Sequence, residues 1–137
     1  MTKDKEIILY NKYSDIGYGE KDIKKAWMMS CECDDGWFIL IDDCLDNIKR
    51  HLINKDKEFV DQFYLCQIKE KFGILMIYVS IYDDYIRGLI DMVQSLSMIT
   101  CEVCGSHKDI GKTKGWIKTV CEKCVIEKNL TNWKKNE

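Results

Sequence analysis

A chain of 137 residues with a formal net charge of −2 can form one modest domain with its own core, or a small domain followed by a metal-binding module. Hydrophobic residues make up 46% of the chain and charged residues 32%, a composition that excludes an intrinsically disordered protein. No apolar run approaches the roughly 18 residues of a membrane-spanning helix, and residues 1–6 lack the apolar stretch of a signal peptide. We therefore expect a cytoplasmic protein.

The charge is distributed unevenly along the chain. Residues 1–99 carry 13 basic and 18 acidic side chains, a balance of −5, whereas residues 100–137 carry eight lysines and five acids, a balance of +3. Four thiolates around a zinc ion would add two negative charges and reduce the second balance to about +1. The basic carboxy-terminal segment is therefore weak support for binding to nucleic acid.

The first part of the chain predicts little regular structure. An apolar cluster of Ile7, Ile8 and Leu9 predicts a short strand, followed by a loop with a turn at residues 17–19. Residues 26–33 are mostly apolar and suit either another strand, which we prefer, or the end of a short helix.

Two helices are predicted more clearly. From Trp37 to Leu52 apolar side chains recur at helical spacing, with Asp34 or Asp35 in the N-cap position. A second apolar stripe runs over residues 86–99, with the pair at 83–84 as its cap.

A β-hairpin is predicted between these helices, after a charged connection at residues 54–61. Residues 63–67 and 73–81 read as its strands, joined through residues 68–73. The second strand is apolar on both faces, which predicts a central place in the sheet. Residues 1–99 are thus expected to form an α+β domain, a small antiparallel sheet with two helices.

The remaining residues, 100–137, are expected to form a zinc-ribbon-like module. We expect a turn at residues 111–115, a strand at 116–120 and a terminal helix at 122–134.

A four-cysteine metal site is the clearest motif. Cys101-x2-Cys104 is separated by sixteen residues from Cys121-x2-Cys124, the spacing of a double zinc knuckle. Four thiolates complete a tetrahedron around one structural Zn²⁺ per chain, and Gly105 permits the left-handed backbone of such a turn. The alternatives are buried or redox-active thiol pairs, or iron in place of zinc. His107 is read as a surface residue because a fifth ligand is unnecessary.

The other four cysteines, Cys31, Cys33, Cys44 and Cys66, do not match the spacing of a zinc knuckle. Cys44 lies on the apolar stripe of the first predicted helix and Cys66 lies in a predicted strand. We interpret all four as core thiols, although a second metal site is the alternative.

No catalytic constellation is recognisable, so we expect a protein that is not an enzyme. The acidic pairs at 34–35 and 83–84 are interpreted as helix caps and the pair at 42–43 as part of a solvated face. His51 ends the first helix, where it suits the negative end of the dipole. The alternative is a hydrolase with an acidic metal site drawn from Asp42, Asp43, Asp83 and Asp84.

Four strings of the chain carry a resemblance to a known group. They are DGWF (35–38), QIKEKFG (67–73), CExCG (101–105) and WIKTVC (116–121). Together they resemble small uncharacterised proteins encoded in bacteriophages and prophages, over about residues 35 to 124. The resemblance implies an accessory protein in the host-cell cytoplasm that acts by binding, and by association an anti-defence role.

Two binding hypotheses follow. In the first, the protein inhibits a host immune protein or sequesters a nucleotide signal. Its candidate contacts are lysines and aromatic side chains around the hairpin and the first segment: Lys69, Lys71, Phe72, Tyr10, Tyr13 and Tyr18. The alternative for Phe72 is a side chain that tucks into the core. The sequence leaves the oligomeric state open, a homodimer included.

The second hypothesis, less favoured, is a nucleic-acid-binding zinc ribbon. Its candidates lie in the metal module: Lys108, Lys112, Lys114, Trp116 and Lys118. Packing of Trp116 on the zinc hairpin is the preferred reading of that side chain.

Overall fold

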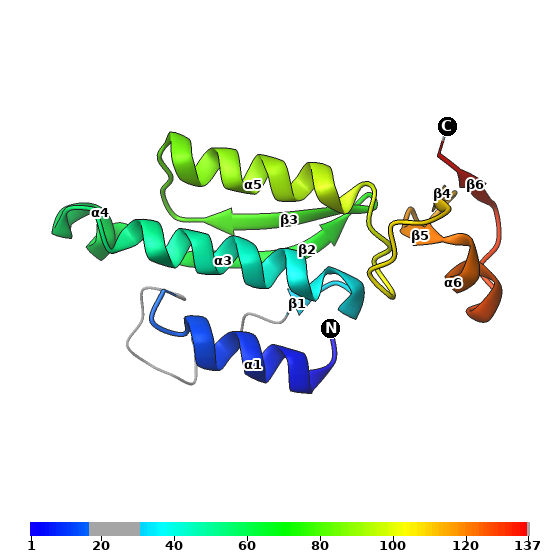
Figure 1. Cartoon of the computed structure of the whole chain (residues 1–137), viewed down its shortest axis with the longest axis horizontal. Coiled ribbons are helices and arrows are strands. Elements are labelled where there is room, and N and C mark those ends of the chain that lie inside the picture. The colour runs from blue at the N-terminus through cyan, green and yellow to red at the C-terminus, as the bar shows by residue number, and fades with distance from the viewer. Residues whose placement is uncertain (17–30, 137) are drawn as a thin grey trace.

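The computed structural model describes residues 1–16 and 31–136, which form an α+β arrangement with two small sheets (Figure 1). The larger amino-terminal unit contains, in chain order, α1 (Lys3–Tyr13), β1 (Cys31–Glu32), the short 3-10 helix η1 (Asp35–Trp37), α3 (Phe38–Leu52), α4 (Lys57–Gln62), β2 (Leu65–Lys71), β3 (Ile74–Val79) and α5 (Asp84–Ser97). The metal module contains β4 (Ile110–Thr113), β5 (Thr119–Cys121), α6 (Glu122–Glu127) and β6 (Trp133–Lys135).

The first sheet has the strand order β1-β2-β3. The predicted hairpin is present, but residues 68–71 extend β2 and only Phe72 and Gly73 make the turn. The prediction of a central second strand is wrong, because β1 pairs with β2 in parallel and leaves β3 at the edge. The first sheet is therefore mixed rather than purely antiparallel.

Helices α3 and α5 lie side by side across this sheet (Figure 1). Both confirm the sequence prediction. The apolar stripe of α3 supplies Ile41, Leu45 and Ile48 to the core, and Leu75 and Ile77 of β3 meet α5. Residues 74–79 were predicted to be covered on both faces, but only Leu75 and Ile77 of β3 are buried, and the residues on its other face are half-buried.

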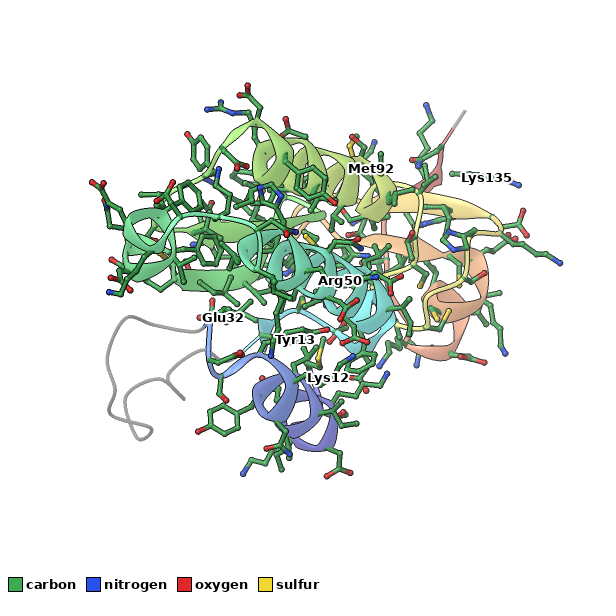
Figure 2. The ribbon with its side chains drawn as sticks, turned by 60° about the vertical axis from the view of Figure 1, so that its left-hand side comes forward. Lys12, Tyr13, Glu32, Arg50, Met92 and Lys135 are labelled. Carbon is green, nitrogen blue, oxygen red and sulfur yellow. The ribbon has the colours of Figure 1, made fainter. Side chains whose placement is uncertain are left out.

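The expected strand at residues 7–9 is instead part of helix α1. Leu9 and Tyr13, four residues apart, are buried against the core, whereas Ile7 and Ile8 are about half exposed. The Tyr13 hydroxyl donates hydrogen bonds to the Asp42 carboxylate and carbonyl oxygens, 2.7 and 2.9 Å away on α3. Figure 2 shows Tyr13 between the two helices. The helix is thus selected by tertiary contacts rather than by the apolar cluster.

Two further local predictions meet the structure differently. Residues 57–62 of the expected charged connection form α4, whose N-cap carboxylate of Asp56 accepts a bond of 2.9 Å from the Phe59 amide. Of the strand expected at 26–33, β1 confirms the part at residues 31–32, while residues 26–30, like the turn at 17–19, lie outside the described residues. Within the described residues no helix is long and apolar enough to cross a membrane.

The metal module is a three-stranded antiparallel sheet of order β5-β4-β6. The turn expected at 111–115 is shorter, because Gly111 to Thr113 belong to β4. A side chain on Gly111 would collide with Trp133, since its Cβ would lie 2.5 Å from the indole ring. That indole donates a 3.0 Å hydrogen bond to the Val120 carbonyl oxygen, so the glycine makes room for the ring.

The strand expected at 116–120 begins later, at Thr119, and the helix expected at 122–134 is wrong beyond residue 127. Asn129 and Asn132 adopt positive φ angles of 50° and 57°, a conformation that asparagine tolerates better than most residues. The chain therefore turns after α6 and returns to pair β6 with β4.

Candidate metal centre

Four cysteines from two distant segments converge in the carboxy-terminal module. The Sγ atoms of Cys101, Cys104, Cys121 and Cys124 all lie within 4.8 Å of one another, and those of Cys104 and Cys121 are 3.7 Å apart. A tetrahedral ion with Zn–S bonds of about 2.3 Å has sulfur–sulfur edges of about 3.8 Å. All four cysteines are free. The cluster therefore has the dimensions of a site for one metal ion, as the spacing predicted.

The first pair sits in a tight turn. Gly105 has a φ of 76°, and its N–H donates a 2.8 Å hydrogen bond to the Cys101 carbonyl oxygen, while the Cys101 N–H donates to the Ser106 carbonyl oxygen at 2.8 Å. The left-handed glycine expected after Cys104 is confirmed. This closed turn directs both sulfur atoms to one point.

The second pair sits at the start of a helix. Cys121 ends β5 and is the N-cap residue of α6, and Cys124 lies in its first turn. The Glu122 N–H donates a 3.0 Å bond to the carbonyl oxygen of Asp109, which has a positive φ of 52°. Strand, cap and helix thus hold the second pair opposite the first.

The protonation of the cluster is set by burial and by mutual contact. Burial raises the pKa of the Cys101 and Cys124 thiols. Burial also opposes ionisation of Cys104, but hydrogen bonds from the Ser106 amide and the neighbouring thiols outweigh it and lower its pKa. A metal ion must displace the protons on these sulfurs, so its affinity falls as the pH falls.

The donor set fits zinc. Four sulfur ligands make a closed tetrahedral shell that leaves no position for a substrate, which is typical of structural zinc; iron is the other ion suited to four thiolates. Among the residues that the structure describes, this is the one convergent group of three or more metal-binding side chains. Cys31, Cys33, Cys44 and Cys66 do not form a second one.

Those remaining cysteines behave as packing residues. Cys31, Cys33 and Cys44 are buried in the amino-terminal core, where burial raises the pKa of each thiol. Cys66 is half-buried, and burial raises its pKa as well. Neutral, buried thiols are poor nucleophiles and poor ligands, in agreement with the interpretation from sequence.

Only one of the four clustered cysteines faces outward. Cys104 is exposed and borders an open hollow of about 450 Å³ that Lys5, Phe38 and His107 also line. The Nδ1 atom of His107 lies 3.2 Å from the Thr100 hydroxyl and stays outside the sulfur cluster. His107 is therefore a surface residue, as predicted.

The string DGWF at residues 35–38 turns out to carry a contact with the metal centre. The Gly36 N–H donates a 2.7 Å bond to the Glu102 carbonyl oxygen, and the Trp37 indole N–H donates a 3.0 Å bond to that of Thr100. A Cβ on Gly36 would lie 2.2 Å from the Cys101 carbonyl oxygen. The absence of a side chain at Gly36 lets η1 press against the first cysteine turn, a role that sequence reasoning missed.

The string QIKEKFG at residues 67–73 makes the second join. The hydroxyl of Thr119, the first residue of β5, donates a 2.6 Å bond to the Gly73 carbonyl oxygen at the hairpin turn. Gly73 has a φ of 73°, and a Cβ there would lie 3.0 Å from that same hydroxyl oxygen. The backbone of the hairpin turn thus contacts the metal module at Gly73.

A charged contact closes the same interface. Lys118 pairs with Asp34 at 2.8 Å and with Glu102 at 3.6 Å, and Glu102 is only 1% exposed. Burial raises the pKa of Glu102, and this effect outweighs the Lys118 charge and the Asp34 amide, which lower it. The Glu102 Oε2 atom is buried and has no hydrogen-bond partner in the described structure. The Lys118 ammonium is therefore already paired within this interface.

The predicted ligand-binding set is not brought together in one place. Tyr13 is 4% exposed with its hydroxyl bound to Asp42, and Tyr10 shares its helix. The Lys69 ammonium of β2 lies over the Tyr78 ring of β3, and the Lys71 ammonium lies over the Phe72 ring at the hairpin turn. Phe72 is 67% exposed, so the idea that it tucks into the core is wrong. Tyr18 lies outside the described residues.

The acidic residues are occupied by structural contacts. Asp83 caps α5 by accepting from the Ile86 amide at 3.0 Å and pairs with His51 at 2.7 Å and Lys55 at 3.1 Å. This cap is as predicted, whereas His51 contacts Asp83 rather than only its own helix end. Asp35 does not cap α3 but accepts from the Thr2 amide at 2.7 Å.

Asp42 is not merely solvated, because it anchors α1. Besides Tyr13, its carboxylate binds the Lys12 ammonium at 2.6 Å. Asp43 and Asp84 are exposed. The four acids proposed for a hydrolase metal site do not converge.

Comparisons of the chain with family models, with curated proteins and with solved structures found no match. Of the resemblance to phage-encoded proteins, the structure supports the four-cysteine cluster resembling a zinc ribbon.

Proposed function

We propose that this chain is a zinc-binding protein in which one structural Zn²⁺ holds the carboxy-terminal module in shape, and that the protein acts by binding a partner rather than by turnover. The observation that carries this proposal is the closed cluster of four sulfur atoms, which is directly joined to the amino-terminal unit through Gly36 and Lys118.

The small size of the module explains why a metal is needed. Its buried cluster consists of three of the cysteines with Ile110 and Val120, and only four partly buried hydrophobic side chains pack against it: Val103, Val125, Leu130 and Trp133. A core of this size supplies little free energy of folding, so small units of this kind depend on a metal. A bound ion would join the turn of Cys101 and Cys104 to β5 and α6 through its four sulfur ligands.

Binding without turnover is supported by the same features. The metal shell is filled by protein ligands, and the conspicuous acids are engaged in caps and ion pairs. Inhibition of a host immune protein remains our hypothesis for the biological role, and it rests on the resemblance to phage-encoded proteins. Capture of a nucleotide signal is less favoured, because Tyr13, one of its proposed contacts, is buried.

The proposal is tested by native mass spectrometry and metal analysis of the purified chain. We expect one zinc ion per chain, and we expect Cys104→Ser to lose the metal and the folded module. Cys66→Ser is the matched control, because that half-buried thiol lies outside the cluster, and it should retain one zinc. A Cys104→Ser variant that stays folded and metal-loaded would refute the site.

A further inference from the structure

The outer part of the metal module gathers positive charge in one place. An open depression of about 440 Å³ is lined by residues of β4, β6 and their flanks: Lys112, Thr113, Lys114, Lys134, Lys135 and Asn136. Four of these six residues are lysines. Figure 2 shows Lys135 at the edge of the molecule, pointing away from it.

The strand register places like charges opposite each other. Lys112 of β4 is the direct partner of Lys134 of β6, so both side chains project from the same face of the sheet. Like charges in this position destabilise a sheet. Neither Lys112 nor Lys114 forms an ion pair with any residue of the described chain, whereas Lys135 is bound to Asp109 at 2.6 Å. An anion from outside would neutralise the charges of Lys112 and Lys114.

An exposed aromatic residue follows these lysines closely in the chain. Trp116 is in the loop that follows β4, two residues beyond Lys114, and its side chain is 77% exposed. Its backbone carbonyl oxygen accepts a 2.7 Å bond from the Thr113 hydroxyl, which ties this loop to the rim of the depression. The prediction that Trp116 packs on the zinc hairpin is wrong, because Trp133 takes that place.

We propose that the depression lined by Lys112, Lys114 and Lys134, together with the adjoining loop at Trp116, binds single-stranded nucleic acid, with phosphates on the lysines and a base on the indole. This inference rests on the proposed metal-folded module and adds a nucleic-acid partner to the protein target proposed above. Lysines that track the phosphates beside an exposed aromatic ring are the combination that binds single strands with little sequence preference. An acidic protein would satisfy the lysines but would leave the exposed indole without a role.

The set differs from the one predicted from sequence. Lys118 is excluded because it pairs with Asp34 and Glu102, and Lys108 does not line the depression. Lys134 joins the set because β6 exists where a helix was expected. A helix at residues 122–134 would not have paired Lys134 with Lys112.

The experiment measures fluorescence anisotropy of a labelled 12-nucleotide oligothymidylate with the full chain, whose zinc content is measured on the same samples. Three phosphate contacts predict that the affinity for the oligonucleotide falls about 20-fold between 50 and 200 mM salt. In the double variant Lys112→Gln/Lys134→Gln, which keeps one contact, the same change in salt should lower the affinity only about threefold. The matched control is Lys123→Gln/Lys128→Gln, which removes the same charge from α6 and its cap and should leave binding unchanged.

The indole is tested separately. Trp116→Ala should weaken binding by at least about fivefold, whereas Phe72→Ala, which removes another exposed ring on the hairpin, should not. The inference would be overturned if both lysine double variants lost the same amount of affinity for the oligonucleotide. It would also be overturned if poly-glutamate bound as tightly as the oligonucleotide and Trp116→Ala had no effect, because the surface would then recognise acidic polymers only.

The metal measurement separates the two proposals. A zinc-loaded chain that does not bind the oligonucleotide overturns this inference and leaves the structural metal in place. A chain that binds the oligonucleotide without metal overturns the metal proposal alone.

Discussion

The backbone N–H of Gly36 donates a 2.7 Å hydrogen bond to the carbonyl oxygen of Glu102, so the amino-terminal unit reaches into the first Cys-x-x-Cys turn. Glu102 lies between Cys101 and Cys104. Its carbonyl group is therefore oriented by a residue 66 positions earlier in the chain as well as by the turn itself. The metal centre and the α+β unit are expected to fold as one cooperative structure.

The first prediction concerns this glycine. Gly36→Ala places a methyl group 2.2 Å from the Cys101 carbonyl oxygen and should reduce the free energy of unfolding by about 1–3 kcal/mol or more, and lower the affinity for zinc. Gly88→Ala is the control. No atom lies within 4 Å of a Cβ at Gly88 in α5, so this change should stabilise the protein by up to about 1 kcal/mol. Urea unfolding and competition with a zinc chelator measure both effects.

The second prediction concerns the buried acid of the interface. Lys118→Met removes the ammonium from Glu102 and should cost about 1–3 kcal/mol of unfolding free energy, because a buried carboxylate then loses its partner. Lys114→Met should change stability by less than about 0.5 kcal/mol, since that lysine is exposed and unpaired in the described structure. Urea unfolding at saturating zinc tests the pair.

Adding Glu102→Gln to Lys118→Met should recover part of the loss, because the double variant buries no charge. Equal stability of the two single lysine variants would mean that Lys118 does not neutralise Glu102.

The third prediction concerns the cap of α5. Burial alone would raise the pKa of Asp83, but hydrogen bonds from His51, the Ile86 amide and Lys55 outweigh it and hold that pKa well below its ordinary value. A lowered pKa in the folded state means that the carboxylate stabilises the fold fully above its unfolded pKa of about 4. The contribution is lost as the pH falls through the lower folded value.

Asp83→Asn keeps a capping side chain but removes the charge. We expect wild type to be more stable than this variant at pH 5, and this advantage to shrink progressively below about pH 4. Urea unfolding at each pH measures the difference, in which loss of zinc at low pH affects both proteins alike. A difference that does not change with pH would contradict the assignment.

The features that the sequence predicted well are those encoded by local spacing. Cys101, Cys104, Cys121 and Cys124 are two turns of fixed geometry, and the helices α3 and α5 show a regular apolar stripe. The cap at Asp83 is also local, because its carboxylate and the Ile86 amide are three residues apart. Such features need no knowledge of the rest of the fold.

The features that the sequence missed depend on distant partners. Helix α1 is buried mainly through Leu9 and Tyr13, too few positions for a recognisable stripe, and Asp42 of α3 anchors it. Strand β6 follows from left-handed turns at Asn129 and Asn132, which leave no strong signal in composition. The role of Gly36 is invisible locally, because its partner is the main chain of residues 101–105.

The joins at Gly36 and Gly73 use main-chain atoms of the amino-terminal unit, which every amino acid supplies. A substitution at Gly36 or Gly73 therefore cannot be rescued by a second substitution in the residue it contacts. Double variants at these two contacts should be no more stable than the single variants predict. In a saturation library screened for folded protein, positions 36 and 73 should accept almost nothing but glycine, for steric reasons at the first and for its φ of 73° at the second. The contact between the two units would then be marked by two glycine-only positions in the screen.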